Sequence, residues 1–405
     1  MAMADQPAGK SFRLSMLLYD TRYRSITIQV IMLLGFIASV VWLLDNMYTN
    51  LAKADKDPDF AFLSSSAGYD INQRLIEYTS QSTHARAWLV GLLNTLLVAF
   101  LGCILATVLG VSVGVMRLSK NWIVSRLMTV YVESFRNVPV LLWIVFAMAI
   151  FIEKFPQPRE FRGEDATAFM YLWDSVAFTN RGWYIPKPIF GDGGMAVVGV
   201  LIASIIGIFI FGKWAKVRQE TTGAILPTFW IKLGILIVPA VLVHFIMGQP
   251  ITLDYPALKG FNFKGGFHLR NSLIALWLAL SMYTAAFIAE AVRAGIMAIN
   301  KGQSEAAAAL GLRQKRVMNL VVLPQALRVI IPPLISQYLN ITKNSSLALA
   351  VGYMDVTGTL GGITLNQTGR ALECILLLMI TYLAISLTIS TVMNIYNNSV
   401  KLKER

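Results

Sequence analysis

The chain has 405 residues, of which 56% are hydrophobic and 14% are charged. Soluble globular proteins carry about 25% charged residues, so this composition excludes an ordinary soluble protein. The formal net charge of +13 could indicate a nucleic-acid partner, and the position of the charges along the chain has to decide that question.

Eight apolar segments follow one another along the chain. A helix of about 20 residues crosses the roughly 30 Å of bilayer hydrocarbon, and most of the segments reach that length. The first segment is too long for the core of a signal peptide, so we expect it to be retained. The eight expected spans are residues 26–44, 88–116, 126–152, 193–212, 228–248, 270–293, 326–350 and 371–396.

The basic residues are concentrated in alternate segments between these spans. With a cytoplasmic N-terminus, the inner segments carry a large excess of Lys and Arg, whereas the outer loops carry slightly more acidic than basic residues. This is the positive-inside pattern of membrane proteins. We therefore expect both termini in the cytoplasm, and membrane orientation explains the net charge without nucleic acid.

Two long outer loops, about residues 45–87 and 153–192, mix charged and aromatic residues. They could fold back as small caps on the outer face, or they could be spacers with little structure. In the second span, Gly110 and Gly114 form a G-x-x-x-G step that would let two helices approach closely, although glycine is common in membrane helices. The two cysteines and three histidines are scattered, so the sequence indicates no disulfide framework, metal site or catalytic cluster.

The segment GIFIFGKW, residues 207–214, fits the beginning of a phosphate-binding loop. Such a loop needs Ser or Thr after the lysine to hold Mg²⁺, and this chain has Trp214 there. We therefore expect the chain itself to bind no cofactor, and any ATP and Mg²⁺ to be used by a partner.

The inner loop between the sixth and seventh expected spans contains SEAAAALGLRQKR, residues 304–316. Residues 304–310 have high helix propensity, and we expect Glu305 in the first turn, where its charge suits a helix N-terminus. Gly311 allows the positive φ that ends such a helix. The run of alanines leaves little side-chain bulk, so the helix could enter a groove of another protein. An amphipathic loop resting on lipid would look similar.

The spacing of this loop resembles the E-A-A motif of ATP-binding-cassette importer permeases. Residues 305–307 read E-A-A, Gly311 follows after three residues, and Val321-x-Leu323-Pro324 follows after nine more. Valine in place of isoleucine at 321 is the only departure from the family's pattern. The segments GLLNTL, ESFRNVPVLL, YTAAFIAEAVRAGI, LPQALRVIIPPL and KNSSLALAVGYMD resemble the polar amino-acid subgroup of that family.

The extra first span and the inserted helix pair at about residues 193–248 resemble the larger permeases of general L-amino-acid importers. The resemblance implies an all-α polytopic membrane protein with a type I importer permease core in residues 88–400. Residues 1–87 would form a cytoplasmic segment, the first span and a periplasmic loop.

The resemblance also implies the function and the partners. The chain would be a bacterial inner-membrane permease subunit, without catalytic residues, that imports L-amino acids such as glutamate, glutamine, aspartate and asparagine. Its partners would be a dimer of cytoplasmic ATPases, a periplasmic binding protein and a second permease, for which a different chain is the better expectation and a second copy the alternative. The residues that would contact the ATPase are Glu305, Ala306, Ala307, Leu310, Gly311, Leu312 and Arg313.

Polar residues inside the expected spans could line the path of an amino acid, because charged groups there usually face partners or a polar path. Glu133 and Arg136 share a helix face and can pair, as can Glu290 and Arg293. Beyond an expected break at residues 332–333, a polar cluster offers donors and acceptors to a zwitterion, although bonding between helices would explain it equally well. The candidate path residues are Asn94, Glu133, Arg136, Tyr283, Thr284, Lys343, Asn344, Ser345 and Ser346.

Two other functions fit the sequence less well. An ion-coupled transporter usually shows inverted repeats, and the sequence shows no internal repeat. A membrane-embedded enzyme would need a catalytic cluster near one face, which the scattered histidines and cysteines do not supply.

Overall fold

The computed structural model describes residues 16–53, 59–163, 166–224 and 226–400. The chain divides into two compact units, one up to Phe62 and one from Leu63 onward. In the first unit, α1 (Met16–Tyr19) precedes α2 (Thr21–Lys53), which is long and apolar enough to cross a membrane. The first expected span is therefore confirmed as a helix, whereas the domain limit expected at residue 87 stays a prediction.

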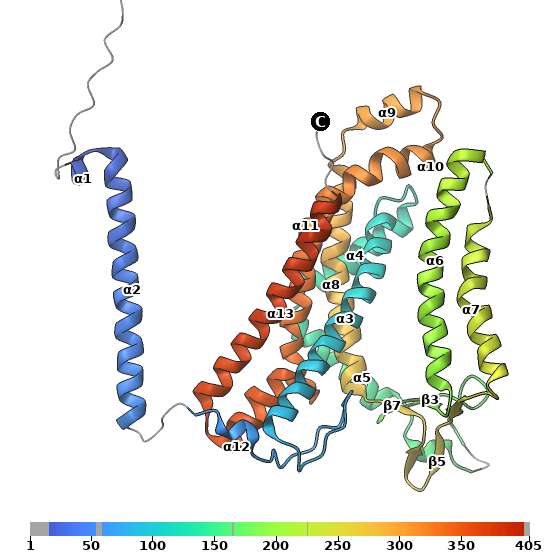
Figure 1. Ribbon diagram of the computed structural model, residues 1–405, viewed down its shortest axis with the longest axis horizontal. Helices are drawn as coiled ribbons and strands as arrows, with labels where there is room; N and C mark the ends of the chain where they lie inside the picture. The colour runs from blue at the N-terminus through green and yellow to red at the C-terminus, as the bar shows by residue number, and fades with distance from the viewer. Residues whose placement is uncertain (1–15, 54–58, 164–165, 225, 401–405) are drawn as a thin grey trace, which may run out of the picture. The chain divides into compact units, whose positions relative to one another are not determined.

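The second unit holds the remaining membrane helices (Figure 1). Over the described residues, 7 helices of the chain could cross a membrane, or up to 8 if one bent pair counts as a single span. A predominantly helical membrane protein with about eight spans is thus confirmed. The long helices of this unit are α3 (His84–Met116), α4 (Trp122–Asn137), α5 (Val140–Lys154), α6 (Gly194–Thr222), α7 (Thr228–Ile246), α8 (Asn271–Met297), α11 (Leu323–Asn344) and α13 (Ala371–Val400).

The structure differs from the expected spans at two positions that contain proline. Residues 126–152 do not form one straight helix, because α4 and α5 meet at an angle of 107°. Val138 has an extended backbone with φ −110° and ψ 132°, since the ring of Pro139 disfavours the helical conformation in the residue before it. The break expected at residues 332–333 was also wrong, because α11 continues through both prolines.

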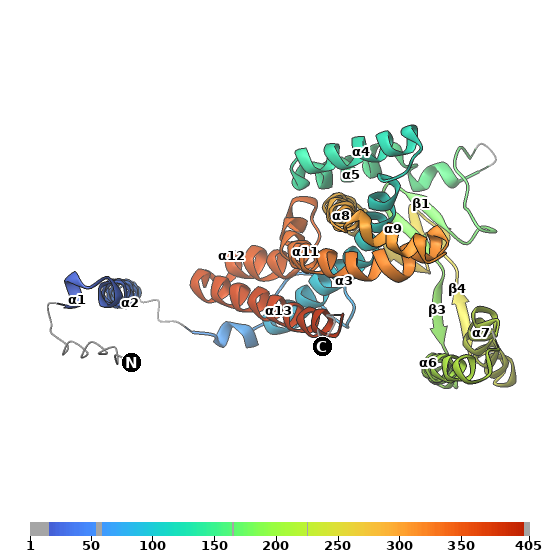
Figure 2. The same cartoon turned by 90° about the horizontal axis from the view of Figure 1, so that it is seen from above.

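Helix α8 is the central helix of the second unit. Of its most apolar 18-residue stretch, 72% is buried inside the protein. It packs against α3, α4, α5 and α11, and Figure 2 shows it end-on between the α4–α5 pair and α3. A Cβ atom at Gly114 of α3 would lie 2.7 Å from the carbonyl oxygen of Ala289, and one at Gly110 would lie 2.6 Å from Ile288. The close helix approach expected at this G-x-x-x-G step is confirmed.

The inserted helices α6 and α7 pack against each other and expose most of their remaining surface. Only 17% and 6% of their apolar stretches are buried in the protein. Residues 207–214, which resemble the start of a phosphate-binding loop, lie wholly inside α6. Their backbone amides therefore serve the helix and cannot cradle a phosphate.

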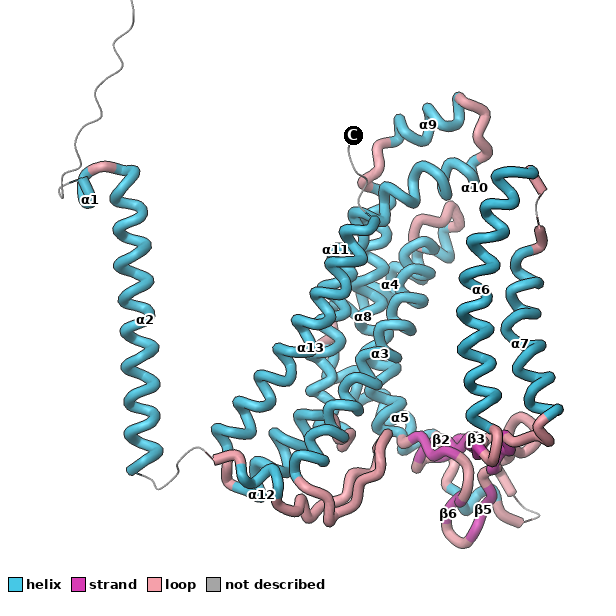
Figure 3. The backbone as a smooth tube through the Cα atoms, viewed as in Figure 1, coloured by secondary structure: helices cyan, strands magenta, loops and turns pink. Residues whose placement is uncertain are grey.

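The loops on either side of the inserted pair fold together into short antiparallel strands (Figure 3). We call the described residues between 155 and 193 and between 247 and 270 the strand module; it also contains the short 3-10 helix η2 (Pro158–Phe161). Its three-stranded sheet has the order β1-β2-β7, and β3-β4 and β5-β6 form two further pairs. The strands are β1 (Ala177–Thr179), β2 (Gly182–Ile185), β3 (Lys187–Phe190), β4 (Ile251–Asp254), β5 (Ala257–Lys259), β6 (Asn262–Lys264) and β7 (Phe267–Leu269).

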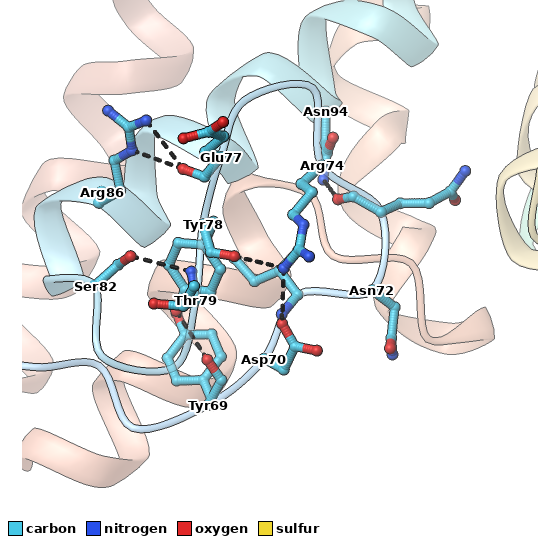
Figure 4. Close-up of polar contacts among 12 residues, drawn as sticks. Tyr69, Asp70, Asn72, Arg74, Glu77, Tyr78, Thr79, Ser82, Arg86 and Asn94 are labelled. Carbon is cyan, nitrogen blue, oxygen red and sulfur yellow. Dashed lines mark hydrogen bonds and ion pairs between the residues drawn. The ribbon is translucent and has the colours of Figure 1, made fainter. Parts of the chain in front are cut away.

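The segment before α3, residues 63–83, forms a cap on the helices (Figure 4). Ile71 and Tyr78 are buried in a cluster that includes Val90 of α3. The Tyr78 hydroxyl donates a hydrogen bond of 2.9 Å to the carbonyl of Tyr69, and burial raises the pKa of Tyr78 to about 12, so the hydroxyl keeps its proton. The sequence left open whether the two long loops fold into caps or are spacers with little structure. This segment and the strand module are both folded and packed, as caps would be.

Candidate functional site

The loop that resembles the E-A-A motif forms α9 (Lys301–Ala309), at the end of the second unit opposite the strand module (Figure 1). The helix begins three residues before the expected residue 304. Asn300 caps it, because its side-chain oxygen accepts a hydrogen bond of 2.9 Å from the amide of Gly302. Glu305 therefore lies in the second turn, and the expected interaction of its charge with the helix N-terminus was wrong.

A sharp turn at Gly311 ends this loop helix. Gly311 has a φ of +80°, as expected from the sequence. Its amide donates to the carbonyl of Ala308 at 2.9 Å, and the amide of Leu312 donates to that of Ala307 at 3.3 Å. A Cβ atom at Gly311 would meet no atom within 4 Å, so a larger residue would strain the backbone without a steric clash. The cost of a left-handed non-glycine residue is about 1–2 kcal/mol.

The coupling loop, residues 300–313, has one face on the protein and one face free. Ala307 packs with Val317 and Val322, and the half-buried Leu312 joins them. On the free face, Glu305 and Ala306 are exposed, and Leu310 is 84% exposed. Gly311 and Arg313 are exposed as well. The loop thus holds a protruding leucine beside small side chains, while Ala307 and Leu312 anchor it to α10 (Gln314–Val317) and to the π-helical turn η3 (Met318–Val322).

Three arginines surround the carboxylate of Glu290 on α8, and we call this group the Glu290 hub. Arg117, at the end of α3, pairs with Glu290 Oε2, and Arg293 lies 3.3 Å from Oε1, as expected. Arg136 of α4 lies 3.9 Å from Oε2. The expected pair of Arg136 with Glu133 was wrong, because the partner of Arg136 lies on another helix. The hub ties α3 and α4 to α8.

The candidate path residues do not gather at one point. Near the hub, the Arg136 guanidinium lies 5.6 Å from the ring of Phe287, which lies 5.0 Å from the ring of Tyr283. Thr284, beside Tyr283, is buried in α8. Glu133 is exposed on α4, and its carboxylate accepts a weak hydrogen bond of 3.4 Å from Asn137.

A second group of candidate residues lies where α11 gives way to the 3-10 helix η4 (Ser345–Val351). Lys343 is exposed and Asn344 is half-buried. The hydroxyls of Ser345 and Ser346 donate to the carbonyls of Thr342 and Lys343, both at 2.8 Å. The hydroxyls of both serines are thus occupied by hydrogen bonds to the backbone of their own helix. The ammonium of Lys343 stays at the surface.

Asn94 of α3 forms a third position, buried beneath the cap. Its side-chain amide donates two hydrogen bonds of 2.8 Å, to the carbonyls of Gln73 and Met354. A cavity of about 350 Å³ adjoins it, lined by Asn72, Gln73, Arg74, Asn94, His268 and Leu273 among others. Asn94 therefore fixes the wall of a cavity between the cap and the strand module, whose lining is largely apolar.

The sequence reasoning missed Asp355, which is fully buried beside this region. Its carboxylate accepts hydrogen bonds from the amide of Gly358 at 2.8 Å and from the hydroxyl of Tyr382 at 3.1 Å. Asp355 thereby begins the π-helical segment η5 (Thr357–Thr364), which α12 (Leu365–Thr368) follows. The sequence signal that could have identified Asp355 is a single acidic residue in the glycine-rich, otherwise uncharged stretch VGYMDVTGTLGG. Among the described residues, no group of three or more His, Cys, Asp or Glu could hold a metal ion.

Comparisons with known proteins show which family the chain resembles. Residues 221–402 match the model of the binding-protein-dependent transport system inner membrane component. The chain is 55% identical, over 100% of both chains, to the glutamate/glutamine/aspartate/asparagine transport system permease protein BztB of Rhodobacter capsulatus. It is 47% identical to the general L-amino acid transport system permease protein AapQ of Rhizobium johnstonii, over 98% of this chain and 96% of that one.

A third relative is the putative amino-acid ABC transporter permease protein YhdX of Escherichia coli, 46% identical over 93% of this chain and 94% of that one. The similarity to all three covers the cap, the inserted helices and the coupling loop. The chain therefore belongs to the family of inner-membrane permease subunits of amino-acid ABC transporters, which are transporters and not enzymes.

Proposed function

We propose that the chain imports polar and acidic L-amino acids, with glutamate, glutamine, aspartate and asparagine as the substrates to test first. The relative from R. capsulatus is named for these four and aligns with the whole chain. The proposal places both termini and the coupling loop in the cytoplasm of a bacterium and the strand module in the periplasm, which the distribution of Lys and Arg supports.

The exposed face of the coupling loop carries the proposal. Leu310 is an apolar side chain, 84% exposed, at the end of a short helix whose other face is anchored to the protein. The alanines beside this leucine leave room for a partner to approach the helix closely. In this proposal Leu310 and Ala306 enter a cleft of the ATPase, Glu305 pairs with a basic group there, and Gly311 sets the angle of the helix. ATP and Mg²⁺ are bound by that partner.

The position of α9 explains how such a contact would move the spans. Only residues 298–300 separate it from α8, the most buried helix, and the Glu290 hub ties α8 to α3 and α4. A rigid-body shift of the loop would therefore be passed to several helices at once. Transport then consists of a change between two packings, biased by ATP on one side and by a loaded binding protein on the other.

The proposed path begins at the cavity beside Asn94 and continues past the polar groups of Lys343 and Asn344 and the Arg136–Tyr283 region. The Arg74 guanidinium at the cavity offers donors to a carboxylate. A second permease, different from this chain, completes the path; a second copy is the alternative, and mass spectrometry of the purified complex decides between them. Unchanged affinity and specificity for labelled amino acids in Lys343→Ala and Asn344→Ala variants would remove both residues from the path.

The coupling assignment is tested with a matched pair of glycines. Gly311 and Gly223 both end a helix with positive φ, and a Cβ atom at either would meet nothing within 4 Å. In proteoliposomes that contain the complete transporter, Gly311→Val should abolish ATP-dependent glutamate uptake at an unchanged amount of protein. Gly223→Val, at the end of α6, should leave uptake close to that of the wild type. Normal uptake by the Gly311 variant would refute the assignment.

A further inference from the structure

The β5–β6 hairpin of the strand module carries a phenylalanine at its tip. Gly260 and Phe261 connect the two strands, and Phe261 is 90% exposed. Figures 1 and 3 show that the hairpin extends beyond the nearby ends of α6 and α7, on the side away from α9. The exposed apolar surface of α6 and α7 is suited to lipid, whereas the hairpin tip lies past the ends of those helices.

The backbone of this tip is held by the other loop of the module. Arg162 donates a hydrogen bond to the carbonyl of Gly260, and Arg181 donates one of 3.1 Å to the carbonyl of Phe261. On the inner side of the hairpin, Phe263 is buried against Ala177 and Tyr184. Because the backbone of the turn is already fixed in this way, binding through Phe261 costs little further backbone entropy, which favours its use as an anchor.

The hairpin and the strand that follows it carry basic side chains and no acidic one. Residues 255–270 contain Lys259, Lys264 and Arg270 and no acidic residue, and both lysines are exposed. The two arginines that hold the tip are exposed as well. An apolar centre with a basic rim is complementary to a partner that presents an apolar pocket among acidic residues.

The hairpin is also connected directly to the centre of the transporter. β6 leads through two glycines into β7, and β7 leads into α8, whose other end leads to α9. Asn271, at the start of α8, donates a hydrogen bond of 2.7 Å to the carbonyl of Asn180 in the strand module. A protein bound at the tip would thus act on the same helix as the coupling loop.

We propose that the tip of the β5–β6 hairpin, with Phe261 as anchor and Lys259 and Lys264 as rim, docks the soluble binding protein through an acidic face of that protein. This proposal rests on the proposed function for the identity of the partner. It goes further by placing an anchor in the strand module, outside the membrane spans.

The test uses the complete transporter in lipid nanodiscs and the soluble glutamate-binding protein of the same bacterium. That protein is identified during purification because it binds labelled L-glutamate. Phe261→Ala should weaken the affinity of the transporter for the binding protein by about 10-fold or more, as expected for an anchor residue. Basal ATP hydrolysis should be unchanged. The control is Phe229→Ala on α7, where a phenylalanine is 69% exposed outside the module; its affinity should equal that of the wild type. Equal affinity in the Phe261 variant would overturn the proposal.

A separate measurement tests the role of the basic rim, Lys259 and Lys264. The double variant Lys259→Gln with Lys264→Gln should weaken binding and reduce its dependence on salt concentration, because it removes attraction between opposite charges. An unchanged salt dependence would contradict an acidic partner face.

A photo-reactive amino acid at position 261 distinguishes the occupants. Cross-linking to the binding protein supports the proposal, whereas cross-linking only to lipid or to a second copy of the chain overturns it. If the wild-type transporter takes up no amino acid with this binding protein, the proposed function fails and this partner with it. If the wild type transports and only the Phe261 result is negative, the docking proposal fails alone.

Discussion

Helices α7 and α8 are both apolar enough to span a membrane, yet the protein buries 6% of the most apolar stretch of α7 and 72% of that of α8. Their small residues differ: α8 contains seven alanines and α7 contains one. Because lipid is as apolar as a leucine side chain, hydropathy does not drive helices together in a membrane, and close packing of small residues does. Hydropathy thus locates a span without showing whether it is central, and between these two helices the number of alanines distinguishes them.

The two regions also differ in their ion pairs, and here the largest effect is expected. Replacing Glu290 by Gln leaves Arg117, whose side chain is 7% exposed, without its carboxylate. Breaking a buried pair in this way costs about 3–5 kcal/mol. Glu220→Gln on α6 breaks an exposed pair with Lys216 and should cost about 0–1 kcal/mol. Unfolding in mixed micelles measures both, and equal losses would contradict the central role of the hub.

Replacement of matched isoleucines tests whether packing or hydropathy stabilises the two helices. Ile288 of α8 is fully buried, whereas Ile237 of α7 is 47% exposed. Ile288→Ala should lower the free energy of unfolding by about 2–4 kcal/mol, because it leaves a cavity among packed helices. Ile237→Ala removes the same atoms from a site that lipid can fill, so the loss should be smaller by at least half. The reverse order would show that α7 packs against a partner.

The smallest effect is expected for a single added methyl group. Gly114→Ala brings a Cβ atom to 2.7 Å from the carbonyl oxygen of Ala289, whereas Gly234→Ala on α7 meets no atom within 4 Å. Overpacking between α3 and α8 should cost about 1–3 kcal/mol. The α7 variant should be neutral or slightly stabilising, since alanine favours a helix. Thermal denaturation in detergent compares the two, and a neutral Gly114 variant would mean that the helices can separate freely.

Local features were predictable from the sequence where backbone conformation or a missing side chain decides them. Gly311 has its expected positive φ, and Gly110 and Gly114 lie where α3 meets α8. Prolines were less predictable: Pro139 lies at a sharp bend between two helices, whereas Pro332 and Pro333 lie inside a continuous helix. In a membrane, neighbouring helices can satisfy the backbone groups that a proline frees, so tertiary context decides.

Features that depend on partners distant in sequence could not be predicted. Arg136 pairs with Glu290 across two helices, although Glu133 was the neighbour at helical spacing. Trp183 of β2 pairs with Leu269 of β7, and the inserted helices separate these two strands in the chain. The strands are three or four residues long, too short for their alternation to indicate either the sheet or its order.

The central claim is that the exposed face of the coupling loop contacts an ATPase. A photo-reactive amino acid in place of Leu310, activated in the complete transporter in native membranes, tests that contact directly. The predicted result is a cross-link to the ATPase subunit, identified by mass spectrometry, that changes in yield when ATP is bound. Cross-linking to lipid alone, with the ATPase present and active, would contradict the claim.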